Sequence, residues 1–122
     1  RNMNKLKYFK ISEFDSPDEI GSGDMMEPDF LEMLDVARDI AGFPFIINSG
    51  FRSISHNQKV GGVKNSSHLM GWAADLSCTT GKRRFLMIEA LLDAGFTRIG
   101  VGDSFIHCDC DPNKSQLTIW TY

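Results

Sequence analysis

The chain has 122 residues, of which 42% are hydrophobic and 11% aromatic, which suits one ordinary core and is too short for two domains. Its formal net charge is −3, from 13 basic and 16 acidic residues, without the clustered basic face of a typical nucleic-acid-binding protein. No apolar run approaches the roughly 18 residues that a membrane span needs, and no secretory leader is visible. We therefore expect one domain over residues 1–122, a monomer that binds neither nucleic acid nor membrane.

The first half of the chain predicts one long helix and one buried strand. Residues 1–27 form a polar lead-in with turn signals at 16–17 and 21–23. A helix is predicted from about Pro28 to Ala41, because proline suits a first helical position and apolar residues recur at helical spacing. These residues are Phe30, Leu31, Leu34, Ala37 and Ile40. The apolar run 43–48 predicts a buried strand, residues 53–60 a short helix and residues 61–67 a loop.

The second half predicts mainly strands. Residues 72–78 form a strand, and a helix follows from Thr80 or Gly81 to about Ala94. The helix residues expected to point inward are Phe85, Ile88, Leu91 and Leu92. Further strands are predicted near 97–101, 104–110 and 116–121, with turns at 102–103 and 111–113. This order indicates a small α+β domain with an antiparallel sheet and helices packed on one side.

The histidines and one aspartate are the candidates for chemistry. The sequence has three histidines, His56, His68 and His107, and no His-Glu-x-x-His motif, so any zinc site must combine separate segments. Asp75 lies inside an otherwise apolar predicted strand, and a buried carboxylate needs a partner because its desolvation is costly. That partner is either a metal ion or an arginine such as Arg52.

Strand alternation separates the residues around the last histidine. Within 105–110, His107 and Asp109 fall on one face, and Cys108 and Cys110 on the other. The two cysteines are therefore expected to pack in the core and not to bind metal. With Cys78 they make an odd count and no Cys-x-x-Cys motif, so three free thiols are the simplest interpretation, and one disulfide with one free thiol is the alternative.

Three ordered segments carry a family resemblance. They are Ser49-Gly50-Phe51-Arg52-Ser53, the stretch from Ser66-Ser67-His68 through Gly71 to Asp75, and Phe105-Ile106-His107. Together they resemble the zinc D-Ala-D-Ala carboxypeptidases and L-Ala-D-Glu endopeptidases, which share their metal core with the hedgehog signalling domain. The resemblance implies that His68, Asp75 and His107 bind one Zn²⁺ per chain, with water as the fourth ligand.

The resemblance also implies roles around the metal. It assigns Arg52 to the substrate or its developing oxyanion, with a surface salt bridge as the alternative, and Ser67 to the pocket lining. Many relatives have an acid three residues before the last ligand, where this chain has Ser104. The general base is then Asp103 or, ranked slightly lower, Asp109. Asp103 equally suits a turn residue, and Asp109 an acid that orients a ligand.

The implied function is zinc-dependent hydrolysis of peptidoglycan stem peptides, by a carboxypeptidase or an endopeptidase acting at the cell wall. A small domain of this kind resembles phage-encoded or secreted lysis enzymes. The alternative is a non-catalytic zinc domain that binds the cell wall or a protein partner, which the departure at Ser104 favours. A metal-dependent nuclease is a weaker possibility, because the acidic charge balance counts against it.

Overall fold

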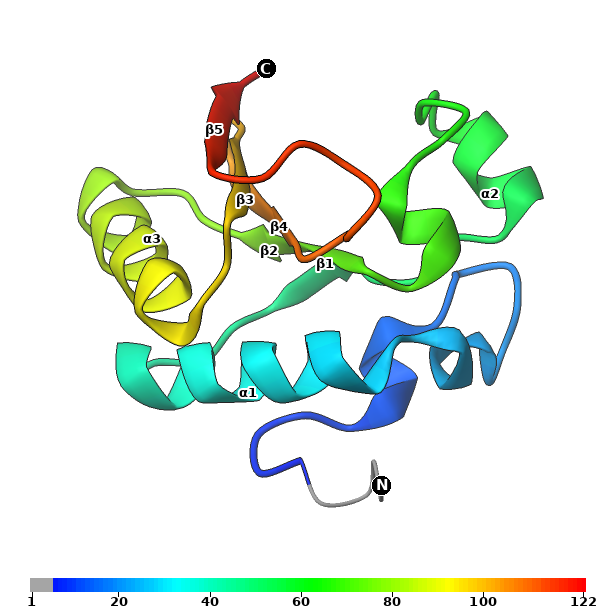
Figure 1. Ribbon diagram of the computed structural model, residues 1–122. Helices are drawn as coiled ribbons and strands as arrows, with labels where there is room; N and C mark the ends of the chain where they lie inside the picture. Colours follow the sequence, from blue (N-terminus) through cyan, green and yellow to red (C-terminus); the bar gives the residue numbers. More distant parts are fainter. Residues whose placement is uncertain (1–5) are drawn as a thin grey trace.

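A five-stranded sheet with the strand order β1-β2-β4-β3-β5 is the centre of the structure, a computed structural model that describes residues 6–122 (Figure 1). The strands are β1 (Ile47–Ser49), β2 (Ala73–Ser77), β3 (Arg98–Val101), β4 (Phe105–Asp109) and β5 (Thr118–Thr121). All neighbouring pairs are antiparallel except β3 and β5, which are parallel. The predicted α+β class is confirmed, and the sheet is mixed at one edge.

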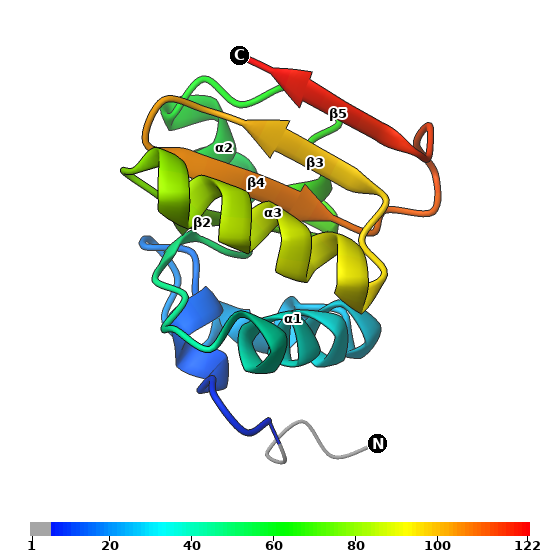
Figure 2. The same ribbon diagram turned by 90° about the vertical axis from the view of Figure 1, so that its left-hand side faces the viewer.

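Two long helices of equal length pack against each other and on the sheet. They are α1 (Pro28–Ala41) and α3 (Gly81–Ala94), and both lie within a residue of their predicted bounds. Each ends at a glycine in the left-handed region, which is the usual stop signal. Figure 2 shows α3 in front of the sheet and the short helix α2 (Ile54–Lys59) behind it. The two faces of the sheet therefore have different surroundings.

The face of the sheet toward α1 and α3 is the core. Its strand residues are fully buried: Ala74, Leu76, Ile99, Ile106 and Cys108. They join one continuous apolar cluster with helix residues that include Phe30, Leu34, Met87 and Leu91. Burial of this apolar surface is the main favourable contribution to folding. As expected, all three cysteines are free, with Cys78 and Cys108 buried and Cys110 half-buried.

The segment before α1 is more than a polar lead-in. Within it, Phe9, Phe14 and Met26 are buried in the main core, and the 3₁₀ turns η2 (Ile11–Phe14) and η3 (Ser22–Met25) shape its path. The carboxylate of Asp15 accepts hydrogen bonds from the backbone N–H groups of residues 21 and 23. The predicted polar lead-in of residues 1–27 therefore also supplies core residues, and its first five residues lie outside the described part.

Both edges of the sheet differ from the prediction. A strand was predicted over residues 43–48, but β1 comprises only residues 47–49. Before it, the ring centres of Phe43 and Phe45 lie 5.7 Å apart. Strand β5 pairs with β3 in parallel because the chain reverses once after β4, through residues 110–117, and then lies beyond β3. On this side of β4 the sheet continues with β3 and then β5, and both run opposite to β4.

The inward face of α3 is rotated from the predicted one. Met87, Ala90 and Leu91 are buried, whereas Phe85 is 69% exposed and Leu92 48% exposed. The buried positions follow the spacing i, i+3 and i+4 of a helix stripe. Apolar type alone did not distinguish this stripe from its neighbours. No helix in residues 6–122 is long and apolar enough to cross a membrane.

Leu34 provides a test of the core. Leu34 is fully buried in α1, whereas Ile40 on the same helix is 46% exposed, contrary to the sequence expectation. We expect Leu34→Ala to lower the free energy of unfolding by about 2–5 kcal/mol through lost burial and a residual cavity. Ile40→Ala is the matched control and should cost less than about 1 kcal/mol. Urea denaturation of both variants checks this, and equal losses would contradict the described packing.

Candidate metal centre

Asp75 and His107 face each other on neighbouring strands. Residue 75 on β2 pairs directly with residue 107 on β4, so both side chains emerge from the same face of the sheet. This face is opposite the core, because the intervening residues 74, 76, 106 and 108 point into the apolar cluster. The Nδ1 atom of His107 lies 3.0 Å from Oδ1 of Asp75. Two of the three predicted ligands therefore meet through the sheet register.

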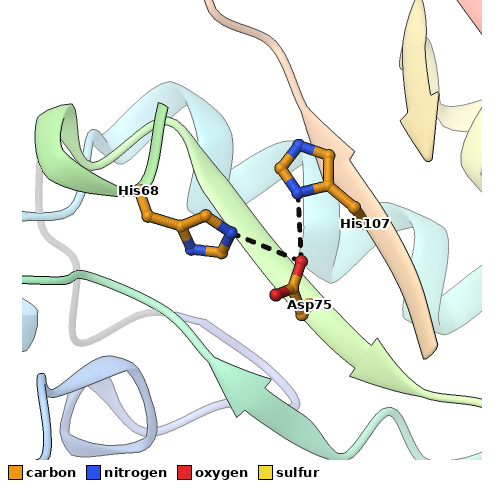
Figure 3. A group of neighbouring side chains, drawn as sticks. All are labelled: His68, Asp75 and His107. Carbon is orange, nitrogen blue, oxygen red and sulfur yellow. Dashed lines mark hydrogen bonds and ion pairs between the residues drawn. The ribbon is translucent and has the colours of Figure 1, made fainter. Parts of the chain in front are cut away.

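His68 reaches the same carboxylate oxygen from a turn before β2. It lies in the 3₁₀ turn η4 (Ser67–Met70), where the Ser66 hydroxyl accepts a hydrogen bond from the His68 backbone N–H at 3.2 Å. Gly71 then has a φ of 76°, and a Cβ there would lie 2.3 Å from the Met25 carbonyl oxygen. Only glycine fits this bend. The Nε2 atom of His68 lies 3.3 Å from Asp75 Oδ1 (Figure 3).

The hydrogen bonds of the two imidazoles fix which nitrogen faces the cluster. Nδ1 of His68 lies 2.7 Å from the Gly50 carbonyl oxygen, which can only accept, so Nδ1 carries the proton and Nε2 presents a lone pair. That buried Nε2 has no hydrogen-bond partner in the described chain. In His107 the outer nitrogen Nε2 lies 2.6 Å from Asp109 Oδ2, which leaves Nδ1 facing Asp75.

The three side chains fit a zinc ion. One ligand atom from each of His68, Asp75 and His107 can be chosen so that all lie within 4.8 Å of one another. Zinc-ligand bonds of about 2.0–2.1 Å in tetrahedral geometry place ligand atoms roughly 3.3 Å apart. The observed separations of 3.3 Å and 3.0 Å from Asp75 Oδ1 match this spacing. The buried Nε2 of His68, which lies beside the Asp75 carboxylate without a hydrogen-bond partner, would also gain a partner by binding a cation.

The electrostatics of Asp75 and His68 favour the protonation states that metal binding needs, whereas in the metal-free chain those of His107 favour its protonated form. Burial raises the pKa of Asp75, but its close contacts with His107 and His68 outweigh burial and hold it well below its usual range. Burial lowers the pKa of His68, which keeps its imidazole neutral. Burial has the same effect on His107, but the hydrogen bonds and charges of Asp109 and Asp75 raise its pKa overall.

Arg52 contacts the second oxygen of Asp75. Its Nη2 lies 3.3 Å from Asp75 Oδ2, while Nε donates to the Ser49 hydroxyl and Nη1 to the Asn57 amide oxygen, each at 3.1 Å. The two partners considered for Asp75 are therefore both compatible with the structure, since they use different oxygens. A Cβ at position 62 would lie 2.8 Å from Arg52 Nη1, so the backbone there closes over the guanidinium.

A cleft of about 480 Å³ opens above the three side chains. Backbone and side chains of residues 60–63, which follow α2, line one part of it, and Phe105, Trp120 and Tyr122 line another. Arg52, predicted to contact substrate, and Ser67, predicted to line the pocket, are both among the residues that line the cleft. The Ser67 hydroxyl is not free there, because it donates to Asp111 Oδ2 at 2.7 Å.

The two predicted general bases, Asp103 and Asp109, lie in different surroundings. Asp103 is exposed in the turn between β3 and β4, its backbone carbonyl accepts a hydrogen bond from Arg84, and it is not among the residues that line the cleft. Asp109 lines the cleft, but its side chain is 1% exposed. Its Oδ2 contacts His107, and its Oδ1 accepts from Arg98 at 2.7 Å. These contacts suit the alternative role expected for Asp109, an acid that orients a ligand.

Sequence reasoning missed Arg98 and the contribution of β5. The charged Arg98 at the start of an otherwise apolar strand was a detectable signal, whereas its pairing in register with Asp109 was not. Trp120 lies on β5 with its ring 5.5 Å from that of His107. This contact depends on the parallel pairing of β5 with β3. A Cβ at Gly100 would lie 2.7 Å from the Trp120 ring, so glycine makes room for it.

Comparison with known proteins places this fold and side-chain cluster in a class. Residues 7–109 match the family described as Peptidase M15, and the chain belongs to this family. It is also 44% identical, over 57 residues, to the zinc D-Ala-D-Ala carboxypeptidase of Streptomyces albus G. The aligned segment covers 46% of this chain and 22% of that relative, so the chain spans only a minor part of the relative's length.

The ligand set is tested by metal content. We expect His68→Ala and His107→Ala to lose bound zinc, because each removes one of three converging ligand atoms. His56→Ala is the matched control, since His56 lies in α2 outside this cluster and should leave zinc content unchanged. Elemental analysis after dialysis against buffered zinc measures the three variants. About one equivalent of zinc in both ligand variants would refute the site.

Proposed function

We propose that this chain is a zinc-dependent peptidase that hydrolyses peptidoglycan stem peptides. The observation that carries the proposal is the convergence of His68 Nε2, Asp75 Oδ1 and His107 Nδ1 at the base of an open cleft. Three protein ligands with an accessible fourth position are the arrangement of catalytic zinc sites, whereas structural sites are closed by four protein ligands. Membership of the Peptidase M15 family supports the same reaction class.

In the proposed hydrolysis, the zinc ion and the residues of the chain have different roles. Bound zinc would polarise the scissile carbonyl and lower the pKa of a bound water to about 7. His68, Asp75 and His107 would hold the ion, and Arg52 would fix the orientation of Asp75 through its second oxygen. The cleft walls of residues 60–63 and β5 would hold the peptide on either side.

A peptide with a free carboxylate suits the charges of the cleft. Arg52, Arg98 and Lys114 line it, and among the described residues only Asp75 and Asp109 line it with opposite charge. The two arginines are paired to these two acids, which leaves Lys114 as the cation available to a ligand. The relative from Streptomyces albus G is named for D-Ala-D-Ala, a dipeptide with such a carboxylate. We therefore favour carboxypeptidase over endopeptidase action, at the bacterial cell wall.

One observation supports the second candidate, a non-catalytic zinc domain that binds the cell wall or a protein partner. In residues 6–122, Asp75 and Asp109 are the carboxylates that line the cleft, and both are committed to histidine and arginine contacts. A peptidase would then depend on the substrate, on a rearrangement or on another group for proton transfer. The phage-encoded or secreted origin expected for such a small domain stays a prediction.

A turnover assay separates the two candidates. A peptide ending in D-Ala-D-Ala is incubated with the zinc-loaded protein, with chelator-treated protein, and with chelated protein resupplied with zinc. We expect release of D-Ala that chelator abolishes and zinc restores. A stem peptide containing L-Ala-D-Glu, assayed by mass spectrometry, reports the endopeptidase alternative. Zinc-dependent binding of both peptides without cleavage would favour the non-catalytic domain and refute the enzyme.

The position of Asp103 predicts the effect of its replacement. Because Asp103 is exposed and contacts the Arg84 side chain only through its backbone carbonyl, we expect Asp103→Asn to keep kcat/KM within about threefold of the wild type. Asp109→Asn, in contrast, weakens the hydrogen bond to His107 and should lower both zinc affinity and turnover. Parallel measurement of zinc content and D-Ala release distinguishes them. A loss of turnover in Asp103→Asn at full zinc occupancy would restore Asp103 as the base.

A further inference from the structure

A buried charge network lies behind His107, on the side away from the proposed metal position. Asp109 ends β4 and is fully buried, and its two carboxylate oxygens have different partners. Oδ2 lies 2.6 Å from His107 Nε2, while Oδ1 accepts from Arg98 Nε at 2.7 Å and from the Asp111 backbone N–H at 3.1 Å. The carboxylate therefore cannot rotate without breaking a hydrogen bond.

Arg98 is held in place by contacts from three parts of the fold. It begins β3, directly opposite Asp109 in the sheet register. Its Nη1 donates to the Ser115 carbonyl oxygen at 2.6 Å, in the loop between β4 and β5. Its guanidinium lies 4.9 Å from the ring centre of Trp120 on β5. The side chain is 12% exposed, so these contacts are largely shielded from water.

We propose that Arg98 is a positioning residue for the metal centre, acting through Asp109 to hold His107 with Nδ1 toward the zinc position. The inference rests on the proposed zinc site. A histidine ligand is oriented by the acceptor of its other N–H group, and that acceptor is itself kept in place by its own hydrogen bonds. Arg98 supplies the bond that fixes Asp109, and Asp109 supplies the one that fixes His107.

The geometry requires an arginine. The Nε and Nη1 atoms of Arg98 donate in two directions, to Asp109 and to the Ser115 carbonyl, while the planar group stacks near Trp120. A lysine ammonium keeps the charge but is a single point on a flexible stem, and it cannot reproduce this fork. Arg98→Lys therefore separates the effect of orientation from that of charge.

The test measures zinc affinity and the histidine tautomer in the same variants. Protein labelled with ¹⁵N-histidine is prepared as wild type, Arg98→Lys and Arg98→Met, each zinc-free and zinc-loaded. Arg84→Met is the matched control, since Arg84 is also partly buried and also donates to a backbone carbonyl of another segment. Chelator competition gives the zinc Kd, two-bond ¹H–¹⁵N correlation gives the tautomer, and thermal unfolding reports folding.

We expect both Arg98 variants to bind zinc about 10–100-fold more weakly than the wild type. In the zinc-free variants His107 should lose its preference for a proton on Nε2, while His68 keeps its proton on Nδ1 because it donates to Gly50. The control should match the wild type in both measurements. If Arg98→Met does not fold, the charge-retaining Arg98→Lys decides.

Two results would overturn the inference, and they differ in what else they affect. Zinc Kd within about twofold of wild type, with His107 still protonated on Nε2 in the Arg98 variants, refutes the positioning role and leaves the proposed peptidase intact. A wild-type protein that binds no zinc refutes both. A loss of zinc affinity that merely follows a fall in Tm, with the tautomer unchanged in the folded fraction, assigns Arg98 to stability alone and also refutes the inference.

Discussion

The register between β2 and β4 is the constraint on which the site depends. It places Asp75 opposite His107 on one face, while the neighbouring pairs Ala74–Cys108 and Leu76–Ile106 lie on the other, inside the core. Because side chains alternate along a strand, a slip of one residue would expose those apolar pairs and bury the two polar ones. The apolar core between the sheet and helices α1 and α3 thereby fixes two of the proposed metal ligands, although it does not include them. The hydrophobic burial that folds the domain therefore also brings Asp75 and His107 together.

His68 is positioned by a different mechanism, and this gives the segment before α1 a role in the site. The turn that carries His68 bends at Gly71, whose carbonyl accepts from the Glu27 backbone N–H at 2.9 Å. Its imidazole is oriented by the Gly50 carbonyl, and the next residue, Phe51, donates its N–H to the Phe14 carbonyl at 2.9 Å. Residues 14 to 27 therefore support both the turn and the acceptor of the histidine. A segment that contributes no residue to the proposed ligand set still determines where one ligand lies.

The parts that could be predicted from sequence are those with local signals. Both long helices have glycine stops and periodic apolar residues, and their bounds were predicted closely. The ligand trio was predicted from short motifs, and the structure brings its three side chains together. The parallel pairing of β5 and the Arg98–Asp109 contact depend on which strands become neighbours, which no local pattern specifies. For the same reason the sequence ranked Asp103 only slightly ahead of Asp109 as the general base. The two aspartates differ in where they lie relative to β3 and α3, and the residues next to them in the sequence do not reveal this.

The charges around the cluster form two similar units. Asp75 and Asp109 each contact His107, and each uses its other oxygen to accept from an arginine, Arg52 in one case and Arg98 in the other. In each unit a negative carboxylate lies beside a positive guanidinium, so the formal charges of the two units sum to zero. A divalent ion added to this balanced set is then the dominant local charge of the cleft. With Lys114 also lining the cleft, the loaded site would attract an anionic group, in agreement with the proposed action on peptides that end in a free carboxylate.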